Sequence, residues 1–166
     1  MTHKLKSGDE APGPRDQEEI DDQFRALMEG LRTTIPGVMV LFSFLLILPL
    51  QAPFNDLGEV DKAVFYLAFG SAALASVLLI SPSVHQRVRA PISGIKRRTW
   101  SHVMYATKMA IVGTVAFLVA ISAVVYLVSS LVFNEPVAVI ATVMFATIAA
   151  WGWFYVPLIK FDSSDD

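Results

Sequence analysis

The side chains best suited to chemistry form one basic cluster in the middle of the chain. Residues 85–100 contain five Lys and Arg side chains, interrupted by Pro91 and Gly94. Clusters of this size beside a membrane can hold the phosphate groups of anionic lipids. The candidate lipid contacts are Arg87, Arg89, Lys96, Arg97 and Arg98. The alternative is that these charges only anchor a loop on one side of a membrane.

Other chemistry has little support in the sequence. The absence of cysteine excludes disulfides and thiolate sites, and His3, His85 and His102 are too dispersed for a metal signature. We find no phosphate loop, nucleophile elbow or paired-carboxylate motif. We therefore expect no enzyme activity, no catalytic or metal-binding residue and no cofactor. A net charge of -2 and a pI near 5.9 also argue against a nucleic-acid partner.

Apolar windows decide the fold class. Hydrophobic residues make up 54% of the 166 residues and charged residues only 17%. Four windows of more than 20 residues lack Asp, Glu, Lys, Arg and His, which is the length a helix needs to cross a membrane. The sequence predicts an all-α membrane protein whose domain, residues 33–160, contains spans at 34–54, 63–84, 109–133 and 136–159. The alternative is a soluble helical protein, whose helices would have polar faces.

The charges between the windows predict topology. Only residues 133–136, at the junction of the last two spans, are available for the turn between them, so these spans must form a tight antiparallel hairpin, and we expect the first two to form another. Of the 13 Lys and Arg residues, twelve lie in the two tails and the central loop, and Lys62 alone lies on the other side. Positively charged short loops stay in the cytoplasm. The sequence thus predicts a multi-pass protein with both termini cytoplasmic.

The segment before the first span divides into two parts. Residues 1–15 are polar and predicted to be disordered, and residues 161–166 form the predicted C-terminal tail. Residues 16–32 form a predicted amphipathic helix, with Ile20, Phe24, Leu27, Met28 and Leu31 on one face. We expect it to lie on the cytoplasmic membrane surface, to pack under the helical domain or to bind a partner. Gly30 and Pro36 predict a bend before the first span.

Small residues mark candidate helix-packing positions. They recur every fourth residue in the second and fourth spans, at Ala68, Ala72, Ser76, Thr142, Ala146 and Ala150. Such spacing lets helix backbones approach closely, either within one chain or between two copies. Because no span carries an ionisable residue, ion-coupled transport is disfavoured. The sequence favours a non-enzymatic structural or accessory component in contact with membrane lipids and with itself or a larger complex. The alternative is a small oligomeric transporter or channel.

Several short motifs resemble an uncharacterised family of small bacterial integral membrane proteins. They are Leu31-Arg32, Gly37-Val38, Leu41-Phe42, Phe44-Leu45-Leu46 with Pro49, and the exit of the second span from Pro82 through His85 to Arg87. The resemblance covers roughly residues 18–160. It implies a bacterial inner-membrane protein with four spans after an acidic amphipathic helix, and no catalytic residues. Members are sometimes labelled sodium:proton antiporters, and many carry glutamines where this chain has Ile35 and Met39.

Overall fold

The computed structural model describes residues 14–51, 54, 56–93 and 100–155. Within these residues there are helices and no strand, which confirms the all-α prediction. The four long helices are α1 (Pro14–Ile47), α2 (Glu59–Ser93), α3 (Trp100–Val132) and α4 (Glu135–Ala150). A 3-10 turn, η1 (Leu48–Leu50), follows α1, and a π-helical turn, η3 (Trp151–Tyr155), follows α4. The predicted tail at 161–166 lies outside the described residues, as do residues 1–13.

The four helices are those of a multi-pass membrane protein in length and composition. Each contributes a candidate membrane span: Glu18–Leu50, Glu59–His85, Val103–Val132 and Glu135–Tyr155. At about 1.5 Å per residue, a helix of 33 to 35 residues is roughly 50 Å long. Since the hydrocarbon core is about 30 Å thick, α1, α2 and α3 must project beyond it.

One continuous helix contains both residues that predict a bend before the first span. α1 runs through Gly30 and Pro36, and Pro36 is exposed on its surface. A proline inside a helix removes one backbone hydrogen bond, costs about 3 kcal/mol and is a usual cause of a bend. Leu31 and Val38, on either side of Pro36, are buried in the same cluster. The two parts of α1 therefore pack against the same neighbours.

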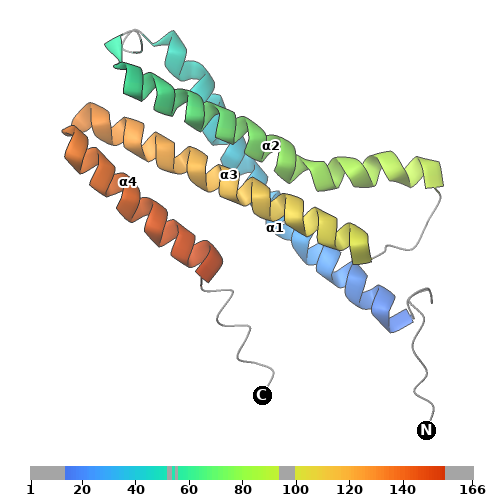
Figure 1. The fold of residues 1–166 in the computed structure, drawn as a ribbon. Helices are drawn as coiled ribbons and strands as arrows, with labels where there is room; N and C mark the ends of the chain where they lie inside the picture. Colours follow the sequence, from blue (N-terminus) through green and yellow to red (C-terminus); the bar gives the residue numbers. More distant parts are fainter. Residues whose placement is uncertain (1–13, 52–53, 55, 94–99, 156–166) are drawn as a thin grey trace.

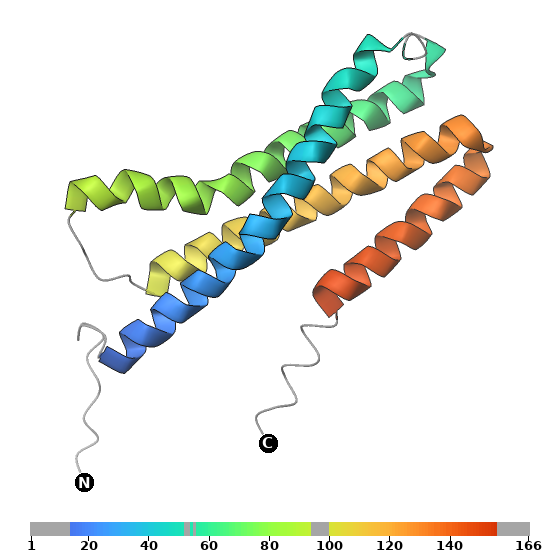
Figure 2. The same cartoon turned by 180° about the vertical axis from the view of Figure 1, so that it is seen from behind.

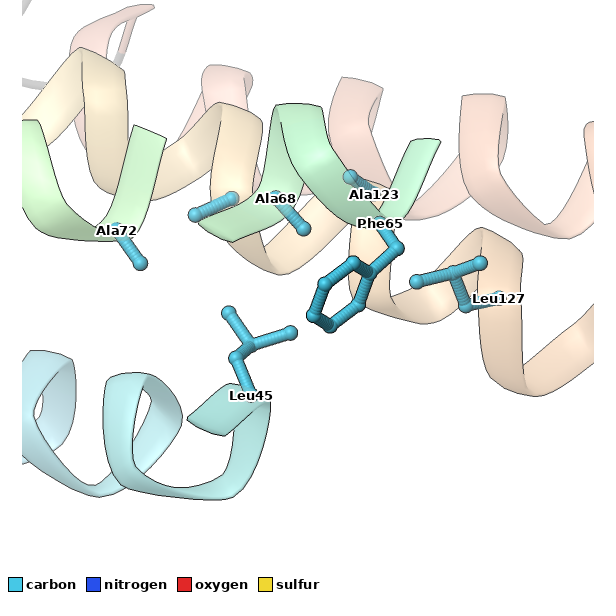
Figure 3. Packing of buried hydrophobic residues seen from close by; sticks show 7 residues of the cluster. Leu45, Phe65, Ala68, Ala72, Ala123 and Leu127 are labelled. Carbon is cyan, nitrogen blue, oxygen red and sulfur yellow. The ribbon is translucent and has the colours of Figure 1, made fainter. Parts of the chain in front are cut away.

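The core is built by α1, α2 and α3. Its buried clusters combine side chains from these helices, and the part nearest the α1–α2 connection contains Leu45, Phe65 and Leu127, one from each. Figure 3 shows the Phe65 ring between Leu45 and Leu127. Figures 1 and 2 show α1 crossing α2 and α3 at an angle.

α4 lies outside this three-helix core. It runs back along α3 from a short turn, and among the described elements the only long helix it contacts is α3 (Figures 1 and 2). Asn134 precedes α4, and its backbone carbonyl accepts hydrogen bonds from the amides of Val137 and Ala138 at 3.1 Å, whereas its side chain makes no capping bond. Because α4 packs on only one of the described long helices, most of its side chains face the surroundings, and Ala138 is its only buried residue.

Two ends of the molecule can be distinguished in Figure 1. The turn end holds the end of η1, the start of α2 and the α3–α4 turn, and the tail end holds the start of α1, the end of α2 and the start of α3. At the tail end α2 extends to Ser93, past the predicted limit at residue 84 and past Pro91. In the described part of the chain α3 begins at Trp100.

Candidate functional site

The small residues of α2 lie in the helical core. Ala68 and Ala72 are completely buried and belong to the cluster around Phe65. Ser76, one turn further on, is half-buried and its hydroxyl donates to the Ala72 carbonyl at 2.8 Å. A serine hydroxyl bonded to its own helix offers little to a ligand. These three positions therefore contribute close packing.

The small residues of α4 lie on the side that carries Ala138. Thr142, Ala146 and Ala150 are half-buried, whereas the intervening Ile140, Val143, Met144 and Ile148 are exposed. The Thr142 hydroxyl donates to the Ala138 carbonyl at 2.8 Å. Since α3 is the only long helix that α4 contacts in the described chain, this small-residue side faces α3. Contact between two copies through these positions would require α4 to leave α3.

The largest group of small residues lies on α3 and was missed by the sequence reasoning. Ala106, Ala110, Gly113, Ala116, Ala120 and Ala123 are all buried. A Cβ added at Gly113 would lie 2.8 Å from Cγ of Leu79, so the two helices meet here without room for a methyl group. The spacing of these residues along the sequence mixes steps of three and four positions, so a pattern of strict four-residue repeats does not include them.

A polar contact joins α2 and α3 at the turn end. The Ser130 hydroxyl lies 3.3 Å from Oδ1 of Asp61 and 3.0 Å from the Leu127 carbonyl. Next to it, Lys62 pairs with Glu59 at 3.7 Å. Through this hydrogen bond, the acidic residue Asp61 links the start of α2 to the end of α3.

Hydroxyls in the spans mostly bond to their own helices. Ser43, Thr114 and Thr147 each donate to the carbonyl four residues earlier, at 2.7 to 2.9 Å. Ser122 differs, because its hydroxyl oxygen is shielded from solvent and has no hydrogen-bond partner among the described residues. An unpaired buried hydroxyl is costly in an apolar setting. Ser122 is therefore the one described span hydroxyl with this property.

The amphipathic segment of α1 packs against the start of α3 at the tail end. Ile20 and Phe24 are buried with Val103 and Ala106, and Leu27 and Met28 pack against them. Glu18, Glu19 and Asp22 are exposed, and Asp22 lies 3.8 Å from Arg25. Of the three placements expected for this segment, packing against the helical domain is the one the structure contains.

The basic candidates divide between described and undescribed residues. Arg87 is exposed on α2, and the backbone of Arg89 lies in the same helix. Lys96, Arg97 and Arg98 lie outside the described residues. Two residues before Arg87, the His85 ring of α2 lies with its centroid 6.2 Å from that of the Tyr105 ring of α3. Arg87 and Arg89 are therefore helical residues rather than members of a loop.

The aromatic residues near the end of α4 form separate pairs. Trp153 stacks on Phe117 of α3 with ring centroids 6.0 Å apart, whereas Trp151 meets Tyr155 edge-on at 5.8 Å. Trp151 and Trp153 are both exposed. These rings contact different neighbours and do not converge on one aromatic ligand site. Exposed Trp and Tyr near the end of a span are typical of a membrane interface.

Comparisons with known proteins agree with the sequence resemblance. No curated protein matches the chain, and no solved structure matches it. In the described part of the chain, no three His, Asp or Glu side chains lie close enough to hold a metal ion. A family model, described as a family of unknown function (DUF6328), matches residues 14–157. This match covers most of the chain and all of its described helices, so the chain belongs to the DUF6328 family.

Proposed function

We propose that this protein is a structural or accessory component of the bacterial inner membrane, without enzyme activity, that works in association with itself or with a larger complex. The observation that carries the proposal is the character of the interior. Among the described residues, no polar or charged residue is buried as a whole, and the buried clusters contain only aliphatic and aromatic side chains. The Ser122 hydroxyl is the one shielded side-chain group there without a hydrogen bond. Such an interior supports helix packing, and a lone serine hydroxyl without a neighbouring base is a weak nucleophile.

The proposed orientation places both termini and the tail end in the cytoplasm. Lys and Arg are concentrated in the segments at the tail end, and Lys62 alone lies at the turn end. The helices would then form two antiparallel hairpins, α1 with α2 and α3 with α4, both connected on the external side. Short external connections with few positive charges suit this orientation.

Single-cysteine labelling tests the orientation, because the chain has no native cysteine. Asp56→Cys and Asn134→Cys place a thiol on exposed residues at the turn end, and Arg25→Cys is the matched exposed position on α1. In intact spheroplasts, a membrane-impermeant maleimide should label the first two and spare the third. Labelling of Arg25→Cys before lysis would reverse the proposed topology.

Association is tested by the mass of the purified complex. Protein expressed at native level and extracted in a mild detergent should elute with copies of itself or with a stoichiometric partner, as measured by light scattering and mass spectrometry. The proposed accessory role would be contradicted if the protein eluted as a monodisperse single chain without a partner. The same result after crosslinking in native membranes would show that extraction had not removed a partner.

The alternative, a small oligomeric transporter or channel, has one observation in its favour. The unpaired Ser122 hydroxyl is a group that a small polar solute could contact within the spans. Proteoliposome flux assays distinguish the two functions. Transport that Ser122→Ala abolishes, and that the intrahelically bonded control Thr147→Val retains, would favour the alternative.

A further inference from the structure

The last turns of α2, at the tail end, have three properties that are typical of a helix bound at a membrane surface. It is helical to Ser93, it is basic, and it exposes apolar side chains. Val84 is 49% exposed and Val88 is 57% exposed, and these residues are one turn apart. No other described part of the chain covers this strip of α2, although both valines are apolar.

The valines continue the outward face of the second span. Val77 is exposed seven residues before Val84, and Val88 follows four residues later, so the three positions share one side of α2. In the span this side would face lipid tails. Val84 lies about 10 Å beyond Val77 along the helix axis. Over that distance the same side of α2 would pass from the hydrocarbon core to the level of the phosphate groups.

A basic position borders the valine strip. Arg87 is exposed immediately beside Val88 in sequence, and the backbone of Arg89 continues the same helix. A long arginine side chain can rest on apolar surface while its guanidinium group bonds phosphate oxygens bidentately. This arrangement matches the charge and the depth profile of an anionic leaflet.

α2 is also free to meet that leaflet. Figures 1 and 2 both show its final turns diverging from α3 and α1, which remain side by side at this end. α2 changes direction in its second half, which contains Pro82 and Pro91, and prolines are a usual cause of such bends. The divergence leaves the valine strip and Arg87 uncovered by α1 and α3.

We infer that Val84, Arg87 and Val88 of α2 form an interfacial segment that binds anionic phospholipid headgroups of the cytoplasmic leaflet. The valines enter the boundary of the acyl chains and Arg87 binds the phosphate groups. The inference deepens the proposed function and rests on the proposed cytoplasmic placement of the tail end. It assigns lipid contact to a described helix end.

Lipid retention by the full-length chain tests the inference. The protein in mild detergent is titrated with phosphatidylglycerol or phosphatidylcholine of the same acyl chains, and bound lipid is counted by native mass spectrometry. Arg87→Gln should weaken phosphatidylglycerol retention about fivefold, the value for one basic residue, and the double variant Arg87→Gln with Arg89→Gln should weaken it at least as much. Phosphatidylcholine retention should not change, and Arg87→Lys should retain most of the selectivity.

The matched control removes charge from another helix. Arg25→Gln changes an exposed arginine on α1, and it should leave phosphatidylglycerol retention unchanged. An equal loss in Arg25→Gln would show a general charge effect and overturn the inference, as would unchanged retention in the double variant. Val84→Ser with Val88→Ser should weaken retention of both lipids. Complete displacement of phosphatidylglycerol by inorganic phosphate would identify a simple anion site and would also overturn it.

The outcome is separate from that of the topology experiment. Retention in detergent does not depend on which side of the membrane the tail end occupies. Reversed cysteine labelling with intact lipid selectivity would refute the orientation and the assignment to the cytoplasmic leaflet while leaving the headgroup site. Correct labelling without selectivity would refute the lipid site alone. Thermal unfolding of each variant, followed by circular dichroism, shows that the fold is intact.

Discussion

Gly113 is the position where the packing of α2 against α3 can be tested most directly. An alanine Cβ there would lie 2.8 Å from Cγ and 2.9 Å from Cδ2 of Leu79, and 3.2 Å from Cβ of Leu78. Leu79 is completely buried, so its side chain is surrounded by other residues of the core. Gly113→Ala should therefore force the two helices apart or push Leu79 out of its preferred rotamer.

The size of the effect follows from two opposing terms. Overpacking of a buried site costs about 1 to 3 kcal/mol, whereas replacing a helical glycine by alanine gains about 1 kcal/mol in helix propensity. Gly70→Ala supplies the matched control, because nothing lies within 4 Å of a Cβ at that position. The propensity gain is common to both variants. Gly113→Ala should thus be less stable than Gly70→Ala by about 1 to 3 kcal/mol.

The assay is unfolding by SDS in mixed micelles, followed by far-UV circular dichroism. Leu79→Ala supplies the second test, since it removes the two nearest atoms that an alanine at 113 would meet and leaves only Cβ of Leu78 at 3.2 Å. Gly113→Ala should cost little in that background, and the difference appears as a coupling energy in a double-mutant cycle. A Gly113→Ala variant as stable as Gly70→Ala, or a penalty that Leu79→Ala leaves unchanged, would refute the close approach of the helices.

Three further substitutions test other contacts. Phe65→Ala should destabilise the protein by about 3 to 5 kcal/mol, and the exposed Phe44→Ala by much less; similar shifts in the SDS midpoint would contradict the assigned core. Ser130→Ala should cost about 0.6 kcal/mol and lose its effect in an Asp61→Asn background, whereas additive costs would show that the two do not interact. Phe24→Ser should speed amide hydrogen exchange in the N-terminal half of α1 and leave α4 unchanged; protection equal to wild type would disprove the packing on α3.

The number and position of the helices could be predicted because the apolar windows are long and free of charge. The spans are shorter than the helices that contain them, since the sequence argument counted only residues that need lipid. Polar helix at the tail end, such as residues 85–93 of α2, has no hydropathy signal. Pro91 also favoured an earlier end, yet Figure 1 shows α2 continuing to its last described turn.

Packing partners were harder to predict than helices. Gly113 and the alanines of α3 follow the natural helix period of 3.6 residues, which alternates steps of three and four, so a four-residue repeat does not detect them. The contact between Asp61 and Ser130 joins residues 69 positions apart, and no local pattern marks such a pair. The continuity of α1 depends on Leu31 and Val38 meeting the same neighbours, which only the tertiary structure reveals.

The unbroken course of α1 has a mechanical consequence. Its buried residues Leu31, Val38 and Leu45 follow one another at seven-residue intervals, and Phe24 continues the same series toward the N-terminus. These four side chains therefore lie on one face of a continuous helix. A molecule that displaced the N-terminal turns would disturb the same packing face that holds Leu45 against α2 and α3.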